Sequence, residues 1–260
     1  MKAAIIGSGN VAEAFARALR GAGVEVTGVY ARNGERGRSV AALAGCGYFD
    51  LSSEISDADI CIAAVSDRAV GEVLERAAID PRTTVVHVAG GCALEAIPEV
   101  YAKRGVVYPL QTFTSGREVD FSQVPFFIEG SDSATTLFLK NFAGRLSPKV
   151  YEADSRQRAR IHITGVFVCN FVNAMYCAGN ALAAGAGMPF EVLKPLIAET
   201  AQKALECSDP RRIQTGPAVR GDGVTLERHR AILASEIADE ELKKIYETLS
   251  EYITKYGKEL

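Results

Sequence analysis

The sequence predicts an α/β fold, a doubly wound parallel sheet followed by an all-helical C-terminal domain. In the first part of the chain, short apolar runs alternate with amphipathic segments, which is typical of β-α units around a parallel sheet. Beyond Glu152 the chain carries helical patterns only. We therefore expect two domains, residues 1–152 and residues 153–260.

The elements of the first domain are expected to follow one another closely. The predicted strands are Lys2–Ile6, Val24–Tyr30, Tyr48–Phe49, Asp59–Val65, Thr84–Val88, Gly105–Tyr108, Pro125–Glu129 and Pro148–Tyr151. The predicted helices are Val11–Arg20, Gly34–Ala44, Arg68–Ala78 and Ala134–Arg145. In the second domain, apolar residues at helical spacing predict the helices Asp154–Ala184, Pro189–Glu206, Leu226–Ala234 and Glu240–Tyr256.

Composition limits the classes of function. Hydrophobic residues make up 48% and charged residues 23% of the chain, which is ordinary for a globular protein. A net charge of −3 gives no basis for binding nucleic acid, and the arginines of segment 156–160 would suit a single phosphate. The six cysteines form no C-x-x-C pair, so we expect no metal site. A strand that starts directly after Met1 leaves no room for a signal peptide, so we expect a cytoplasmic protein.

The segment Ile161–Phe190 contains no charged residue and is long enough to cross a membrane. It carries one histidine and three asparagines, which would be costly against lipid. We therefore expect a helix that is buried in a soluble domain or a dimer, with no membrane contact.

The strongest motif is the G-x-G-x-x-A pattern Gly7-Ser8-Gly9-Asn10-Val11-Ala12. It follows a predicted strand and opens a predicted helix, which is the context of the Rossmann dinucleotide site. There the first glycine allows the turn, the second lets the pyrophosphate approach the backbone, and the alanine allows close packing of helix and strand. Free N–H groups at the helix start would face the phosphates. We expect all six residues to belong to a cofactor site.

The end of the second strand indicates which dinucleotide binds. A site for NAD usually carries Asp or Glu there, whereas this chain has Tyr30, Arg32 and Asn33. Arg32 can stack on the adenine and pair with a 2′-phosphate, assisted by Arg36 and Arg38. We therefore expect NADP, although arginines at a helix start are also common as solvated residues.

Two further strand ends are expected to reach the ligand. Val65 and Ser66 would pass beneath the cofactor, and Gln111, in the segment Tyr108–Phe113, would reach the reacting carbon. His87 also follows a strand, and we interpret it as a structural histidine.

The uncharged helix has a polar stripe. At about 100° per residue, one face carries His162, Cys169, Asn173, Tyr176 and Asn180, and Asn170 lies near its edge. These groups need partners, which either a ligand or a second helix can provide.

The segment Gln214–Asp222 contains two glycines and a proline among polar residues. Asp222 can serve as the cap of the following helix, whereas Arg220 is suited to hold a carboxylate or phosphate.

Gly7–Ala12, Tyr108–Phe113, His162–Asn170 and Gln214–Asp222 together resemble a bacterial oxidoreductase family with a Rossmann-like first domain and a helical second domain of unknown function. More broadly, the chain resembles pyrroline-5-carboxylate reductases and deazaflavin-dependent NADP oxidoreductases. This resemblance implies the use of NADP and a homodimer formed through the helical domain. It implies no substrate.

The chain departs from the related β-hydroxyacid dehydrogenases and ketopantoate reductases, which use a lysine near the start of the long helix. No lysine lies between Lys149 and Lys194, so His162 is the proton donor that remains in this region. This departure disfavours a hydroxyacid and leaves an imine, a ketone or no reduction at all.

Two hypotheses follow. In the first, the protein is an NADP-dependent oxidoreductase for a small, anionic imine or carbonyl compound, with a catalytic site of His162, Gln111, Asn170 and Arg220. Arg220 would come from the same or the partner subunit of a homodimer whose interface contains the helix from Arg160 onward. In the second, the protein is a non-catalytic NADP(H)-binding sensor, which needs a closed pocket but no proton donor.

Overall fold

The computed structural model describes residues 1–257 and divides into two compact units, Met1–Phe171 and a second unit that begins at Val172. The sequence places a boundary at Glu152, where strands give way to helices. The compact units instead divide within the long helix, because the first turns of this helix pack on the sheet of the first unit.

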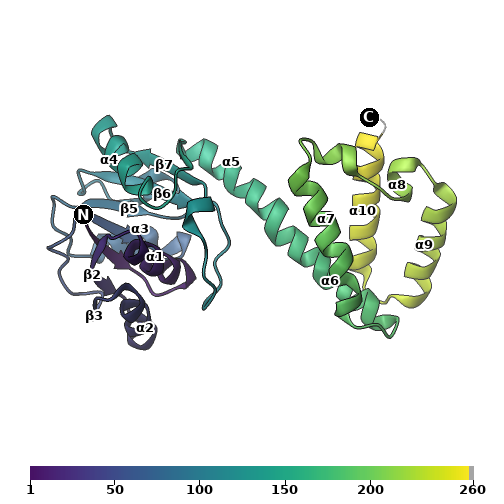
Figure 1. The fold of residues 1–260 in the computed structure, drawn as a ribbon, viewed down its shortest axis with the longest axis horizontal. Helices are drawn as coiled ribbons and strands as arrows, with labels where there is room; N and C mark the ends of the chain where they lie inside the picture. Colours follow the sequence, from purple (N-terminus) through teal and green to yellow (C-terminus); the bar gives the residue numbers. More distant parts are fainter. Residues whose placement is uncertain (258–260) are drawn as a thin grey trace. The chain divides into compact units, whose positions relative to one another are not determined.

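The first unit is built around an eight-stranded sheet with the order β3-β2-β1-β4-β5-β6-β7-β8 (Figure 1). The strands are β1 (Lys2–Ile6), β2 (Glu25–Tyr30), β3 (Gly47–Phe49), β4 (Ile60–Ala63), β5 (Thr84–His87), β6 (Arg104–Pro109), β7 (Phe126–Gly130) and β8 (Val150–Glu152). Strands β1 to β6 are parallel and have the order of a Rossmann sheet. Strand β7 is antiparallel to β6, and β8 is parallel to β7. The predicted fold class is confirmed.

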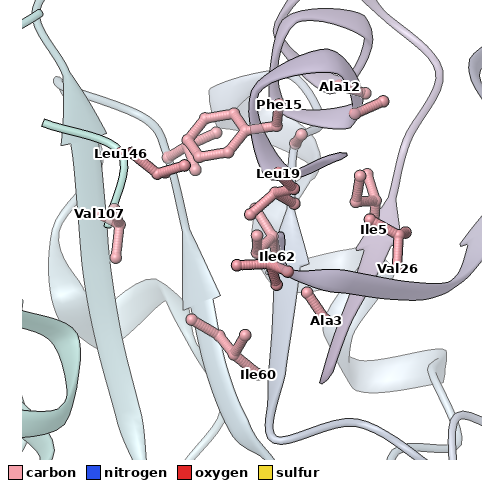
Figure 2. Packing of buried hydrophobic residues seen from close by; sticks show 14 of the residues in the cluster. Ala3, Ile5, Ala12, Phe15, Leu19, Val26, Ile60, Ile62, Val107 and Leu146 are labelled. Carbon is pink, nitrogen blue, oxygen red and sulfur yellow. The ribbon is translucent and has the colours of Figure 1, made fainter. Parts of the chain in front are cut away.

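Helices cover both faces of the sheet. Helices α1 (Asn10–Gly21), α2 (Gly34–Ala44) and α4 (Ser133–Ala143) contribute to one buried cluster, and α3 (Val70–Arg76) contributes to the other. Because side chains alternate along a strand, Ala3 and Ile5 of β1 face the first cluster and Ala4 and Ile6 face the second. Figure 2 shows Phe15 and Leu19 of α1 in the first cluster.

The long helix has three parts, α5 (Ser155–Gly165), a π-helical stretch (Val166–Phe171) and α6 (Val172–Gly185). A capping box formed by Asp154 and Gln157 fixes its start. Arg158 is fully buried, pairs with Glu129 of β7 and donates to the backbone oxygen of Cys92 at 2.6 Å. The expectation that segment 156–160 suits a phosphate is therefore wrong for Arg158, whose charge is already neutralised in the core.

After α6, the described residues of the second unit form helices and short turns only, as predicted. The helices are α7 (Lys194–Glu206), α8 (Pro217–Arg220), α9 (Gly223–Glu236) and α10 (Glu240–Gly257). Short 3-10 turns, Phe190–Leu193 and Pro210–Ile213, flank α7, and the predicted helix start at Pro189 is such a turn. Arg230 pairs with Glu247 at 2.9 Å and joins α9 to α10.

Candidate functional site

The first unit has a cleft of about 1090 Å³ at the carboxyl ends of its parallel strands. Its wall is formed by the glycine-rich turn after β1, the ends of β2 and β4, the loop after β6 and the segment 162–170 of the long helix. Of the predicted site residues, those that line the cleft are Gly7, Ser8, Gly9, Asn10, Val11, Tyr30, Arg32, Asn33, Val65, Ser66, Gln111, His162 and Asn170.

The glycine-rich turn has the geometry of a phosphate-binding turn. Gly7 has a φ of 120° and donates its N–H to the backbone oxygen of Tyr30 at 2.8 Å. A Cβ at Gly7 would collide with the backbone oxygen of Ala64. Gly9 precedes α1 without a side-chain cap, and no heavy atom lies within 4 Å of the place that a Cβ would take. The open space and the free N–H groups of the helix start fit a pyrophosphate.

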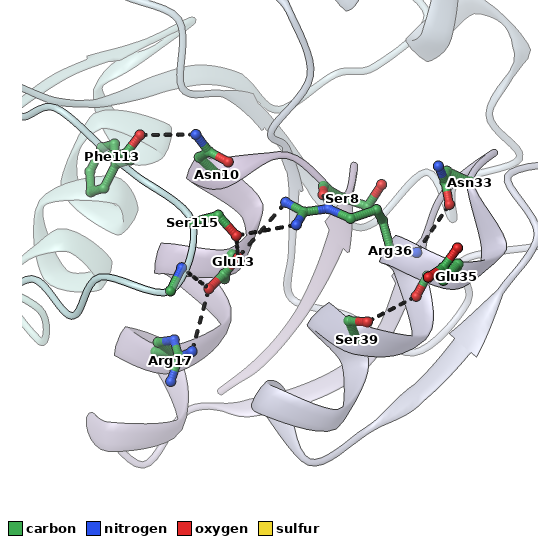
Figure 3. A network of polar contacts seen from close by, with 11 residues as sticks. Ser8, Asn10, Glu13, Arg17, Asn33, Glu35, Arg36, Ser39, Phe113 and Ser115 are labelled. Carbon is green, nitrogen blue, oxygen red and sulfur yellow. Dashed lines mark hydrogen bonds and ion pairs between the residues drawn. The ribbon is translucent and has the colours of Figure 1, made fainter.

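Arg36 is hydrogen-bonded to this turn (Figure 3). Its guanidinium donates to the backbone oxygen of Ser8 at 3.3 Å and to the hydroxyl of Ser115 at 3.2 Å, and it lies 3.8 Å from Glu13. Arg38 lies 5.6 Å from the ring centroid of Tyr48. Both arginines therefore have contacts within the first unit, and their assistance at a 2′-phosphate stays a prediction.

Arg32 differs from these two arginines. It is exposed at the cleft and has no hydrogen bond or ion pair within residues 1–257. Its neighbour Asn33 caps α2 by accepting from the N–H of Arg36 at 3.0 Å. Tyr30 is buried and stacks on Phe49 with 5.1 Å between the ring centroids. Among these side chains, Arg32 is the one placed to meet an anionic group.

The loop after β6 is tied to α1 (Figure 3). Asn10 donates to the backbone oxygen of Phe113 at 3.1 Å, and Glu13 accepts from the hydroxyl of Ser115 at 2.8 Å and from the N–H of Gly116 at 2.9 Å. The hydrogen bond from Gly116 is the main reason that the pKa of Glu13 lies below its ordinary value. Gln111, in the same loop, is exposed at the cleft.

Tyr108 and His162 meet at the cleft. The Tyr108 hydroxyl lies 3.2 Å from Nδ1 of His162, and the rings pack edge to face at 5.9 Å. Burial, with a contribution from Asp67, raises the pKa of Tyr108. A Cβ at Gly90 would lie 2.6 Å from the Tyr108 ring and 2.8 Å from Nδ1 of His162, so this close pairing requires glycine there.

The π-helical stretch changes which residues of the long helix share a face. A π turn is wider than an α turn, so the residues after it are rotated back around the helix axis. Asn170, expected at the edge of the stripe, lines the cleft together with His162 and Cys169. Asn173, Tyr176 and Asn180 belong to the second unit.

Two predicted site residues do not line the cleft. Ala12 is fully buried in the core, where it allows α1 to approach the sheet, which is the role that the motif predicts for it. Arg220 ends α8 in the second unit, and its role stays a prediction.

His87, interpreted as structural, is fully buried. Its ring accepts from the N–H of Ala89 through Nδ1 and lies 3.1 Å from the backbone oxygen of Ala93 through Nε2. Burial lowers its pKa to about 4. These contacts agree with the structural interpretation.

Sequence reasoning missed Asp67 and Tyr108 as site residues. Both line the cleft, and Asp67 lies close enough to raise the pKa of Tyr108. Asp67 lies shortly after β4 and Tyr108 lies near the end of β6. The carboxyl ends of both strands were already predicted to face the ligand, so the signal was present. The pairing of Tyr108 with the long helix was not readable from the sequence.

Within residues 1–257, no group of three or more His, Cys, Asp or Glu side chains is placed to hold a metal ion. One helix in this range, Ser155–Gly185, is long and apolar enough to cross a membrane, and the single chain buries none of its most apolar window. The single chain alone therefore does not bury this helix, and its burial in a dimer stays a prediction.

Comparisons with known proteins agree with the fold and the cleft. Residues 124–253 match the domain of unknown function DUF2520, and residues 2–91 match the coenzyme F420-dependent NADP oxidoreductases. A solved structure from Bacteroides fragilis, provisionally described as an NADP oxidoreductase, is 36% identical over 98% of each chain, with a TM-score of 0.85. The chain belongs to this family of NADP oxidoreductases with a DUF2520 domain, and the predicted class, NADP-dependent oxidoreductase, is confirmed.

More distant structures share the fold. A Thermotoga maritima protein is 19% identical over 99% of this chain and 98% of its own, with a TM-score of 0.75. A reductive aminase from Aspergillus terreus, in complex with NADPH and ethyl-5-oxohexanoate, is 16% identical over 98% and 94%, with a TM-score of 0.71. A search of curated proteins found no match.

Proposed function

We propose that the protein transfers a hydride between NADP(H) and a small, anionic imine or carbonyl compound. One observation carries this proposal. A single cleft contains both the uncapped helix start at Gly9 with the unpaired Arg32 and the hydrogen-bonded pair of Tyr108 and His162.

The residues of the first part of the cleft would hold the cofactor. Gly9 and the N–H groups of the following residues suit the pyrophosphate, and Arg32 suits the 2′-phosphate. Val65 and Ser66 would lie along the cofactor, which supplies the hydride when bound.

The residues at the other end of the cleft would serve the acceptor. As the hydride adds to the acceptor carbon, a proton from His162 would pass to the acceptor nitrogen or oxygen. Gln111 and Asn170 would orient the acceptor by hydrogen bonds. Arg220 would bind its anionic group, because it is exposed and carries no ion pair within residues 1–257.

The exposed apolar face of the long helix supports the proposal that the protein forms a homodimer. Four large apolar residues of the long helix are 49% to 75% exposed in the single chain: Ile163, Phe167, Val168 and Phe171. Exposing this apolar surface to water is unfavourable, and a second copy of the chain would cover it. Asparagines in the same helix are better satisfied across a protein interface than in lipid.

The reaction is tested by NADPH oxidation with a panel of cyclic imines, ketones and their carboxylated analogues. We expect turnover with at least one carboxylated member, and His162→Ala should lower it by a factor of roughly 100 or more without changing NADPH affinity. Tight NADPH binding without turnover on the whole panel would favour the sensor instead.

The dimer is tested by sedimentation of the variant Phe167→Asp. Phe167 is 62% exposed and does not line the cleft, so a charge there should be tolerated by the monomer but not by the interface. Leu137→Asp on α4, at a position 60% exposed, is the matched control and should remain dimeric. A monomeric unmodified protein at micromolar concentration would contradict the proposal.

The subunit that supplies Arg220 is tested by mixing two inactive variants. If the site combines His162 of one chain with Arg220 of the other, then His162→Ala mixed with Arg220→Ala forms one intact site per heterodimer and regains activity. If both residues act within one chain, both sites stay damaged and the mixture stays inactive.

A further inference from the structure

The Tyr108–His162 pair leaves the two nitrogens of the imidazole in different surroundings. Nδ1 lies 3.2 Å from the Tyr108 hydroxyl, and the space beside it is closed by Gly90. Nε2 has no hydrogen-bond partner among the described residues, and it is not one of their buried unpaired atoms. Since His162 lines the cleft, Nε2 is the ring nitrogen that is open to solvent and to a ligand.

The Tyr108 hydroxyl can serve both charge states of the imidazole. It is 8% exposed, and burial raises its pKa, so it keeps its proton at neutral pH. A neutral hydroxyl donates to Nδ1 of a neutral imidazole and accepts from the Nδ1–H of an imidazolium. Asp67 adds a negative charge nearby, which further disfavours a tyrosinate.

We propose that Tyr108 is a positioning residue of this site: its hydroxyl occupies Nδ1 of His162, so that the proton passes to the acceptor through Nε2. The role in the reaction rests on the proposed function, whereas the pairing at Nδ1 does not.

The Nε2 proton of the imidazolium goes to the acceptor nitrogen or oxygen while the hydride adds to the acceptor carbon. The imidazole left behind is neutral, keeps its Nδ1 proton and donates it to the Tyr108 oxygen. Solvent then returns a proton to Nε2, and the tyrosine hydroxyl stays protonated throughout.

The pairing is tested by nitrogen-15 NMR of the imidazoles in the protein without added ligand. His162→Gln assigns the His162 resonances against those of His87 and His229. Tyr108→Phe should shift the Nδ1 resonance of His162 and change the ratio of its two neutral forms. Tyr101→Phe is the matched control, because the Tyr101 hydroxyl is also buried but bonds to the backbone oxygens of Leu74 and Ala77. An unchanged Nδ1 resonance in Tyr108→Phe would overturn the proposal.

Gly90→Ala provides a second variant that keeps both partners. Its Cβ would lie 2.6 Å from the Tyr108 ring and 2.8 Å from Nδ1, so it should separate the pair and reproduce the NMR change of Tyr108→Phe. If Gly90→Ala separates them without any change at Nδ1, the pairing is wrong.

With an acceptor found by the panel, Tyr108→Phe should lower kcat about tenfold, the size expected for one hydrogen bond at a charged group. It should also move the pH profile of kcat and leave the KM for NADPH unchanged. An unmoved profile would overturn the role in proton transfer. If no acceptor is turned over, the proposed function fails, but the NMR result still decides the pairing.

Discussion

Two segments of this molecule each contain two glycines among polar residues, but they differ in structure. In the turn Gly7–Asn10, Gly7 lies against the backbone oxygen of Ala64, and Gly9 lies at the open cleft. The segment Gln214–Asp222 uses two of its polar side chains, Gln214 and Asp222, within its own unit. Gln214 accepts from the hydroxyl of Tyr256 at 2.9 Å, and Asp222 caps α9 by accepting from the N–H of Thr225 at 3.1 Å.

The two segments also differ in how closely their glycines are packed. Both segments contain a glycine with positive φ, 120° at Gly7 and 111° at Gly216. Only the first glycine is closely surrounded, because a Cβ at Gly216 would meet nothing within 4 Å. Unused N–H groups and a required close approach are what a phosphate-binding turn needs, whereas glycine content alone does not predict one.

The largest effect is expected for Gly7→Ala compared with Gly216→Ala. Both changes put a side chain on a backbone with positive φ, which costs roughly 1–3 kcal/mol of stability. Only Gly7→Ala also drives a Cβ into the Ala64 backbone, so it should weaken NADPH binding by a factor of roughly 100 or prevent folding. Calorimetric titration measures the NADPH affinity of each variant, and thermal unfolding measures its stability. Equal losses of NADPH affinity in the two variants would contradict the comparison.

A smaller effect is expected for Arg32→Ala. The loss of a charge-assisted contact to the 2′-phosphate should weaken NADPH binding roughly 10- to 100-fold and leave NADH binding unchanged. Arg38→Ala is the matched control, because Arg38 is exposed on the same helix start but packs over Tyr48. Equal affinities of the unmodified protein for NADPH and NADH would make the assignment of Arg32 wrong.

Local patterns were sufficient to predict much of the fold. The strand β1 and the helix α2 begin and end where the sequence places them, because a buried apolar run and an Asn33 cap define their limits. The glycine-rich turn could be read for the same reason, since its requirements concern neighbours along the chain.

Features that depend on distant contacts could not be read in this way. Arg158 looks like a surface arginine until the strand that carries Glu129 is placed beside it. The π-helical stretch has no clear signature in an uncharged sequence, yet it contains Asn170, which lines the cleft. The contact of Tyr108 with His162 joins residues 54 positions apart.

The smallest effect is expected for Glu13, which ties the loop after β6 to the binding turn. Its pKa is lowered in the folded protein, chiefly by the N–H of Gly116, from an ordinary value of 4.5. Because the carboxyl pKa is lowered, ionised Glu13 stabilises the folded state at every pH above its ordinary pKa. This stabilisation is lost as the pH falls through the pKa that Glu13 has in the folded protein. Glu13→Gln should therefore reduce the fall in Tm between neutral pH and acid pH. Glu118→Gln is the control, because Glu118 also faces Arg17, but at 3.7 Å and with its side chain 85% exposed. If the Tm of both variants falls in acid as much as that of the unmodified protein, the hydrogen bonds that Glu13 accepts from Ser115 and Gly116 do not contribute to stability.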